Sequence, residues 1–169
     1  MPTPPPEFAA YFALLEVSSL VQHGVEHQLR EDGDLSFVQF QILAVLEEAL
    51  DGTQTMTALA DRLVLSRSGL TYQAHMLERA GLLTRAQAVD DERSKVLALS
   101  DAGRRRLSAV LPGHMEVVRD ILLDPLTAAD RAELTRLLDK VRTHMRARPP
   151  RSAQRAAGPA RARATGSAD

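Results

Sequence analysis

Residues 65–83, LSRSGLTYQAHMLERAGLL, combine a helical apolar row with side chains that donate and accept hydrogen bonds. Leu70, Ala74 and Leu77 recur at helical spacing, which predicts that they form the buried side. The other side carries hydroxyls, amides and one early arginine. Short polar groups in the first turn of a helix let a backbone approach phosphate, and longer ones reach base edges. The candidate DNA contacts are Ser66, Arg67, Ser68, Thr71, Tyr72 and either Gln73 or His75.

A second polar cluster lies in residues 88–94, AVDDERS. A tip arginine such as Arg93 suits the narrow minor groove, whose negative potential attracts it. Asp91 is placed to hold that guanidinium through a charge-assisted hydrogen bond. Arg85 and Lys95 flank the segment and complete the candidate DNA contacts. The alternative is an ordinary exposed turn pair, which contributes little.

Residues 23–27, HGVEH, match the His-x-x-Glu-His pattern of some zinc peptidases. Two histidines four residues apart lie on one helix face and suit Zn²⁺, with Glu26 as general base. Gly24 weakens a helix at this point, and no third ligand is apparent. An ordinary pair of helix histidines is the alternative, and we expect no catalytic residue, metal or cofactor.

Four helices are predicted in the first half of the chain. An apolar stripe predicts the first over residues 7–30, and EDGD at 31–34 ends it. Ser36 and Gln39 form a capping-box pattern, which starts a second helix over about 37–49. A third follows Thr55. A fourth begins at the cap residue Ser66, runs to residue 80 and stops at Gly81.

After Gly81 the spacing of apolar residues changes from that of helices to that of strands. Residues 82–85 and 95–99 predict a β-hairpin joined by a long loop. A helix over about 101–123 follows, and Thr127 with Asp130 caps a last helix that ends near residue 145. Residues 1–6 are rich in proline, and residues 146–169 are basic and poor in large apolar side chains. We expect both ends to be disordered.

Charge and composition narrow the classes of function. Residues 62–106 carry 9 basic and 5 acidic residues, whereas residues 1–61 carry 1 and 10. A positive middle segment favours an anionic partner such as nucleic acid. The basic tail is either a solvated, dispensable tail or a source of salt-dependent, sequence-independent attraction to DNA. The chain contains no cysteine, which excludes disulfides and thiol chemistry. Without a signal peptide or an apolar run of membrane length, we expect a cytoplasmic protein that does not enter the membrane.

The order of these elements resembles the MarR family of transcriptional regulators. The most specific pieces are LADRL at 59–63, the Ser66-x-Ser68 start, Leu77-Glu78-x-x-Gly81-Leu82, Asp91-x-Arg93, and Leu99-Ser100-x-x-Gly103. The resemblance implies a mainly α fold with a small β-hairpin wing. It covers a domain at 7–145, in which about 37–100 are the winged helix-turn-helix and 7–30 with 101–145 are dimerisation helices.

The resemblance also implies a function. Members are homodimers that place one winged helix on each half of a pseudo-palindromic operator in double-stranded DNA. They usually repress transcription and are often released by small aromatic or phenolic effectors. Many carry Arg or Lys where this chain has Tyr72 and Met76, so guanine recognition by a bidentate arginine falls to Arg67. A winged-helix adaptor without DNA binding and, less favoured, a metal-dependent enzyme remain the alternatives.

Overall fold

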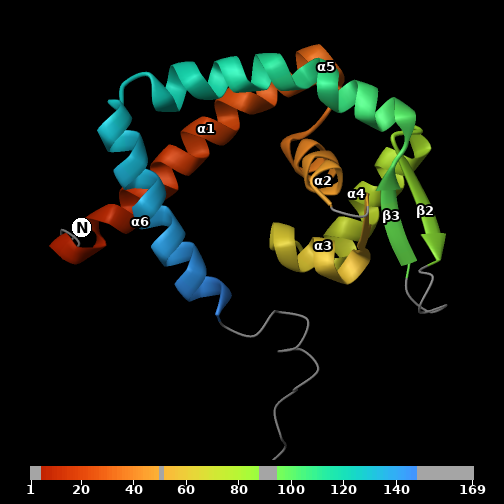
Figure 1. Ribbon diagram of the computed structural model, residues 1–169, viewed down its shortest axis with the longest axis horizontal. Coiled ribbons are helices and arrows are strands. Elements are labelled where there is room, and N and C mark those ends of the chain that lie inside the picture. Colours follow the sequence, from red (N-terminus) through yellow and green to blue (C-terminus); the bar gives the residue numbers. More distant parts are fainter. Residues whose placement is uncertain (1–4, 50–51, 88–94, 148–169) are drawn as a thin grey trace, which may run out of the picture.

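The computed structural model describes residues 5–49, 52–87 and 95–147. These residues form mainly helices, together with one small antiparallel sheet. Figure 1 shows α1, α5 and α6 as an extended frame, with α2, α3, α4 and the strands gathered to one side. The predicted class, mainly α with a β-hairpin wing, is confirmed. The elements in chain order are η1 (Pro6–Phe8), α1 (Ala9–Gly33), α2 (Phe37–Glu47), β1 (Thr53–Thr55), α3 (Met56–Leu63), α4 (Arg67–Arg79), β2 (Leu83–Gln87), β3 (Lys95–Leu99), α5 (Asp101–Val118), η2 (Arg119–Leu123) and α6 (Ala128–Arg146).

A serine or threonine starts each of the helices α2 to α6. In every case its side chain accepts a hydrogen bond from the backbone N–H three residues on, which satisfies a donor that the helix leaves free. Two of these caps are reciprocal capping boxes, as the sequence predicts. Such a cap stabilises a helix by about 1 kcal/mol. The cap residues are Ser36, Thr55, Ser66, Ser100 and Thr127.

The structure adds one strand to the prediction and moves several boundaries. The strand β2 is Leu83–Gln87 rather than 82–85, and the predicted helix over 101–123 is α-helical only to Val118 and continues as the π-helical η2. The first helix continues to Gly33, three residues beyond its expected end, and stops where Asp34 takes a φ of 50°. Aspartate tolerates this left-handed conformation, and its N–H bonds back to the carbonyl of Arg30. The strand β1 was not predicted. It pairs antiparallel with β3, from Thr53 opposite Ala98 to Thr55 opposite Val96.

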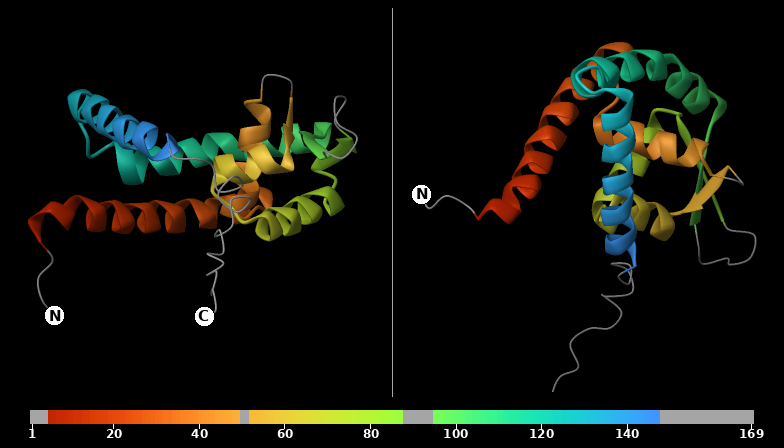
Figure 2. Two further views of the ribbon diagram at one scale, coloured as in Figure 1. Left: turned by 90° about the horizontal axis from the view of Figure 1, so that it is seen from below. Right: turned by 60° about the vertical axis from the view of Figure 1, so that its left-hand side comes forward.

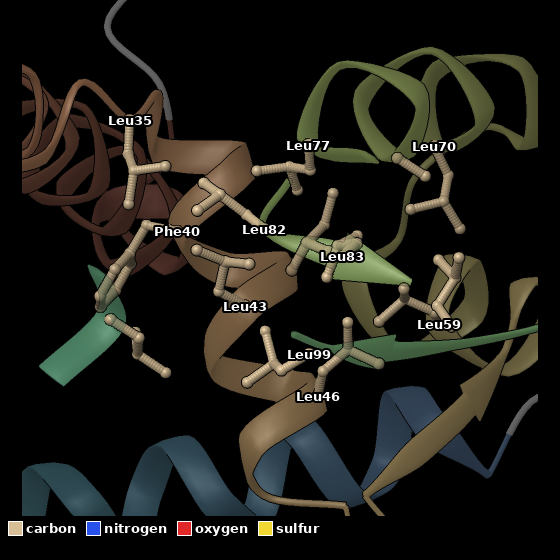
Figure 3. Close-up of a cluster of buried hydrophobic side chains, with 14 of the residues drawn as sticks. Leu35, Phe40, Leu43, Leu46, Leu59, Leu70, Leu77, Leu82, Leu83 and Leu99 are labelled. Carbon is tan, nitrogen blue, oxygen red and sulfur yellow. The ribbon is translucent and has the colours of Figure 1, made fainter. Parts of the chain in front are cut away.

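The core lies around α2, which is covered by α1, α4, α5 and the sheet. Leucines dominate it, as Figure 3 shows for ten labelled side chains and their neighbours. Each fully buried leucine contributes about 1.5–3 kcal/mol relative to an exposed one. The buried apolar residues are Val25, Leu29, Leu35, Phe40, Ile42, Leu43, Leu46, Leu59, Ala60, Leu70, Ala74, Leu77, Leu82, Leu83, Leu97, Leu99, Leu107 and Val110.

The two ends of the frame contribute little to this core. Helix α6 has no buried residue, and α1 has none before Val25. Figure 2 shows the first half of α1 extending away from the winged domain, whereas α6 runs back toward that domain at its C-terminal end. Both helices nevertheless carry large apolar side chains on their surface. Within the described ranges no helix combines the length and apolarity that a bilayer span requires.

Candidate nucleic-acid interface

The first turn of α4 is built for an exposed helix start. Ser66 is extended, with φ −70° and ψ 150°, and its Oγ accepts from the N–H of Gly69 at 3.0 Å. The Ser66 and Ser68 hydroxyl oxygens lie 3.3 Å apart. Both serines are exposed, so small polar groups surround a helix N-terminus whose dipole favours negative charge.

The two sides of α4 divide as the sequence predicts. Leu70, Ala74 and Leu77 are at most 1% exposed and pack into the core. Arg67, Ser68, Thr71, Tyr72 and His75 are exposed. Gln73 is half-buried, so His75 is the better placed of those two alternatives for a ligand.

Thr71 is already engaged within the helix. Its Oγ1 donates to the carbonyl of Arg67 at 2.7 Å. A hydroxyl whose proton is used in this way still has a lone pair free to accept. Thr71 therefore offers an acceptor and a methyl group to a partner, rather than a donor.

Met76 adds apolar surface beside Tyr72, which was already predicted to contact DNA. Tyr72 is 61% exposed, and Met76 one turn later is 37% exposed. Residues four apart share a helix face, so these side chains form a short apolar ridge beside the polar groups. The i, i+4 spacing was the signal available in the sequence. Such a ridge is suited to thymine methyl groups in a major groove.

Arg85 joins the wing to α4. Its Nη2 lies 3.2 Å from Glu78 Oε2, and the two side chains are only 21% and 32% exposed. Its Nε is buried and has no hydrogen-bond partner among the described residues. Ion pairs that are partly removed from water are screened less than surface pairs. The structure thus gives Arg85 a role in fixing β2 against α4.

The remaining predicted contacts lie in the wing. Asp91 and Arg93 fall outside the described residues. Lys95 begins β3, where its backbone pairs with Gln87, and its side chain lies outside the description as well.

The base of the wing is closed by Ser100. Its Oγ donates to the carbonyl of Gly81 at 2.6 Å and accepts from the N–H of Gly103 at 3.0 Å. Gly81 has a φ of 72°, which glycine adopts without penalty. A Cβ on Gly103 would lie 2.1 Å from the carbonyl oxygen of Leu82, so only glycine fits. These contacts explain the Leu77-Glu78-x-x-Gly81-Leu82 and Leu99-Ser100-x-x-Gly103 motifs physically.

His114 lies behind the winged domain, on α5. Its ring packs on Phe40 of α2 with centroids 4.3 Å apart. Burial disfavours the charged imidazolium and lowers the pKa of His114 below its ordinary value of 6.5. The Nδ1 atom is buried without a partner in the part of the chain that the structure describes. Burial therefore favours the neutral form of this histidine.

The two histidines of HGVEH are on the surface of α1, whereas Val25 between them is buried in the core. His23 and His27 are both exposed, and His27 Nδ1 lies 3.1 Å from Glu31 Oε2, which is not part of the motif. Across residues 5–49, 52–87 and 95–147 no three histidine, aspartate or glutamate side chains gather to hold a metal ion. The pair consequently shows the geometry of an ordinary helix-surface contact.

Comparison with known proteins connects this geometry to one family. Residues 33–94 match the model of the MarR family. The chain is 34% identical over 116 residues to the transcriptional regulator PecS of Dickeya dadantii, covering 66% of this chain and 67% of PecS. It is 30% identical over 112 residues to the transcriptional repressor YetL of Bacillus subtilis, covering 66% of each. The solved structure of Sco3205 from Streptomyces coelicolor in complex with DNA superposes with a TM-score of 0.75 at 26% identity, over 83% of this chain and 89% of Sco3205.

Proposed function

Because the chain belongs to the MarR family of DNA-binding transcriptional regulators, we propose that it is a ligand-responsive repressor that binds a pseudo-palindromic operator as a homodimer. YetL, one of its relatives, is named as a repressor. In keeping with this role we propose a cytoplasmic location. The relatives are regulators and not enzymes, so a catalytic role for HGVEH is not retained.

The exposed face of α4 carries the proposal. In this docking mode the second helix enters the major groove with its N-terminal residues at base edges. Ser66 and Ser68 are suited to phosphate, and Arg67 to the O6 and N7 atoms of guanine. Tyr72 is suited to a thymine methyl or a phosphate.

The other predicted contacts take supporting roles in the same mode. Thr71 offers an acceptor to a base edge or a bridging water, and His75 lies further along the groove. Arg85 positions the wing through its pair with Glu78. Asp91, Arg93 and Lys95 belong to the wing, where the arginine is the proposed minor-groove contact.

The apolar faces of α1 and α6 support the homodimer. Phe8, Phe12 and Leu15 on the N-terminal arm are 48–50% exposed. On α6, Leu137 and Val141 are 45% and 51% exposed. Contiguous apolar surface of this kind marks association sites in soluble proteins, and a second copy supplies the same surface in a twofold arrangement.

Selection of bound sequences from a random DNA pool, with the full chain, tests the proposal. We expect a palindrome whose half-sites are centred about 34–36 Å apart, the spacing of successive major-groove turns. Sedimentation of the protein alone and with the selected DNA gives the stoichiometry, for which two chains per site are expected. Failure to enrich any sequence would favour the adaptor.

The effector is tested after the operator is known. Small aromatic and phenolic acids are added to the complex, and fluorescence anisotropy of labelled operator reports its release. Release at micromolar concentration, without loss of the folded state, is the expected result. A complex that survives every compound of this class would contradict the proposed type of effector while leaving the repressor assignment intact.

A further inference from the structure

The C-terminal end of α6 lies beside the helix-turn-helix. Arg146, the last residue of α6, donates from Nη2 to the carbonyl oxygen of Arg62 at 3.1 Å. Arg62 is in the last turn of α3, four residues before Ser66, the cap of α4. Figure 1 shows α6 running back from η2 to end near α3. The basic tail, residues 146–169, therefore starts next to the turn that leads into α4.

The basic tail and the rest of the chain have opposite charge. Residues 1–145 carry 15 basic and 21 acidic side chains, whereas the tail carries 6 and 1. Helix α4 itself contributes only Arg67 and Arg79 as arginines or lysines. Affinity for DNA that does not depend on base sequence comes from cations that neutralise phosphates. The tail is thus the part of this chain best supplied with such cations.

The acidic side chains nearest to this point already have basic partners. Glu48, at the C-terminal end of α2, pairs with the Arg62 guanidinium. Its neighbour Glu47 pairs with Arg104 of α5 at 3.1 Å. An arginine of the tail would have to compete with these pairs on its own chain. A phosphate of bound DNA offers it an anion without that competition.

The composition of the tail limits what else it can bind. After Met145 the chain contains no aromatic residue and no Val, Leu, Ile or Met. Such a segment has no large apolar side chain with which to pack on a protein surface, so its interactions are expected to be electrostatic. Guanidinium groups form strong charge-assisted hydrogen bonds to phosphate oxygens.

The tail is long enough to extend past the base pairs that α4 would read. The 22 residues at 148–169 span roughly 25 Å on average as an irregular chain and about 75 Å when fully extended. One turn of DNA is about 34 Å long. Arginines that start beside α4 can therefore reach phosphates on either side of a half-site.

We propose that the basic tail binds the DNA that flanks the operator, with its arginines on phosphates outside the base pairs that α4 reads. This rests on the proposed function, which puts α4 in the major groove and hence the start of the tail close to DNA. Helix α4 supplies recognition of sequence, and the tail supplies affinity that does not depend on sequence. The bond of Arg146 to the Arg62 carbonyl holds the first residue of the tail at the helix-turn-helix.

Fluorescence anisotropy with the full chain and two labelled duplexes tests the proposal. One duplex is the selected operator alone, and the other adds about 15 base pairs of unrelated sequence to each end, which exceeds the mean reach of the tail. At about 50 mM salt we expect the flanked duplex to bind at least tenfold more tightly, and the difference to shrink as salt is added. No gain from the flanks would overturn the proposal and leave a solvated tail.

Two sets of substitutions show whether the tail supplies that gain. The first set removes the charges and keeps the chain length, and the second replaces the same five residues with lysine, which keeps the charges. We expect the glutamine set to bind both duplexes within about twofold of each other and the lysine set to keep most of the gain. A glutamine set that keeps the gain, or a lysine set that loses it, contradicts the phosphate contacts. The first set is Arg148→Gln, Arg151→Gln, Arg155→Gln, Arg161→Gln and Arg163→Gln.

Hydroxyl-radical footprinting on the flanked duplex locates the contact. The original protein is expected to protect flanking sugars that the glutamine set leaves accessible, with the same central footprint in both. Identical footprints would show that the tail binds elsewhere, for example on its own chain, and would overturn the proposal. Failure of the proposed function looks different, because no sequence would then be bound in preference to random DNA. In that case equal binding of random DNA by the original protein and the glutamine set would overturn the tail contact as well.

Discussion

The exposed residues of α4 differ in what they offer to DNA. The Arg67 guanidinium is exposed in the first turn and makes no hydrogen bond within the described residues. The Thr71 hydroxyl, by contrast, donates to the Arg67 carbonyl and keeps only acceptor capacity. Tyr72 and Met76 add apolar contact area. In the proposed docking mode, discrimination between bases is therefore expected to depend on few side chains, each with a distinct chemical role.

Replacing Arg67 with alanine tests whether this side chain recognises a guanine base. A bidentate contact to guanine discriminates by about 1–3 kcal/mol, so affinity for the selected operator is expected to fall roughly tenfold or more. Affinity for random DNA of the same length is expected to fall much less. Fluorescence anisotropy with both DNAs makes the measurement.

Arg79→Ala provides the control, because Arg79 is exposed at the last position of α4. It is expected to change both affinities by similar small factors. If Arg67→Ala weakens operator and random DNA equally, Arg67 contacts phosphate and not a base.

His114 gives the fold a dependence on pH. Its folded-state pKa is lowered by burial, so the unfolded chain binds more protons as the pH falls below 6.5. The stability that depends on a neutral His114 is therefore fully present well above pH 6.5 and decreases as the pH falls toward the lowered pKa. We expect the urea midpoint to fall between pH 7.5 and 5.5, and His114→Gln to reduce this fall.

His144→Gln is the matched variant, since His144 is exposed on α6. It is expected to retain the full pH dependence of the original protein. A His114→Gln variant with an unchanged dependence would assign the acid sensitivity to other groups.

At the scale of elements, the sequence predicts what is decided locally. Helix starts were predictable because the capping Ser or Thr side chain accepts a hydrogen bond from a backbone N–H only three residues later. The buried residues Leu70, Ala74 and Leu77 of α4 were predictable from their helical spacing. The strand β1 was not, because three residues gain their order only from pairing with β3 more than 40 residues later. The pair of Arg85 with Glu78 is close in sequence and was missed because it joins a strand to a helix, whose relative placement neither element decides alone.

Gly103 and Gly69 offer a matched test of packing at the base of the wing. Each is the third residue of its helix and donates its N–H to the cap serine at 3.0 Å. A Cβ on Gly103 would meet the Leu82 carbonyl oxygen at 2.1 Å, whereas one on Gly69 meets only Ser66 Oγ, at 3.0 Å. Gly103→Ala is expected to destabilise the protein by about 1–3 kcal/mol.

Gly69→Ala is expected to be neutral or slightly stabilising, because alanine is the better helix former by about 1 kcal/mol. Urea unfolding of both variants makes the comparison. Equal effects on stability would show that the wing base adjusts to a side chain at Gly103.

At the scale of the whole molecule, the winged domain buries most of its large apolar side chains. The first half of α1 and the whole of α6 leave theirs exposed. Helix α6 touches the winged domain through its end, where Arg146 Nη2 donates to the carbonyl of Arg62 at 3.1 Å. Its leucines face outward along the rest of its length. The proposed homodimer covers these side chains and sets the distance between two copies of α4.

Leu137→Glu tests this arrangement. A charge placed in an apolar interface loses its hydration without gaining a partner, so the dimer is expected to dissociate at concentrations at least tenfold higher than normal. Sedimentation equilibrium measures the change. Thr135→Glu adds the same charge beside the apolar face and is expected to leave the dimer intact; equal weakening in both would point to charge repulsion along α6.

The two hydrogen bonds of Ser100 have a mechanical consequence. The Ser100 hydroxyl connects Gly81, which follows the C-terminal end of α4, to Gly103 in the first turn of α5. The hydrogen bonds of this one side chain therefore connect α4, the base of the wing and the first turn of α5. In the proposed homodimer, we expect a rotation of α5 to move α4 and the wing together, and so to change the distance between the two copies of α4.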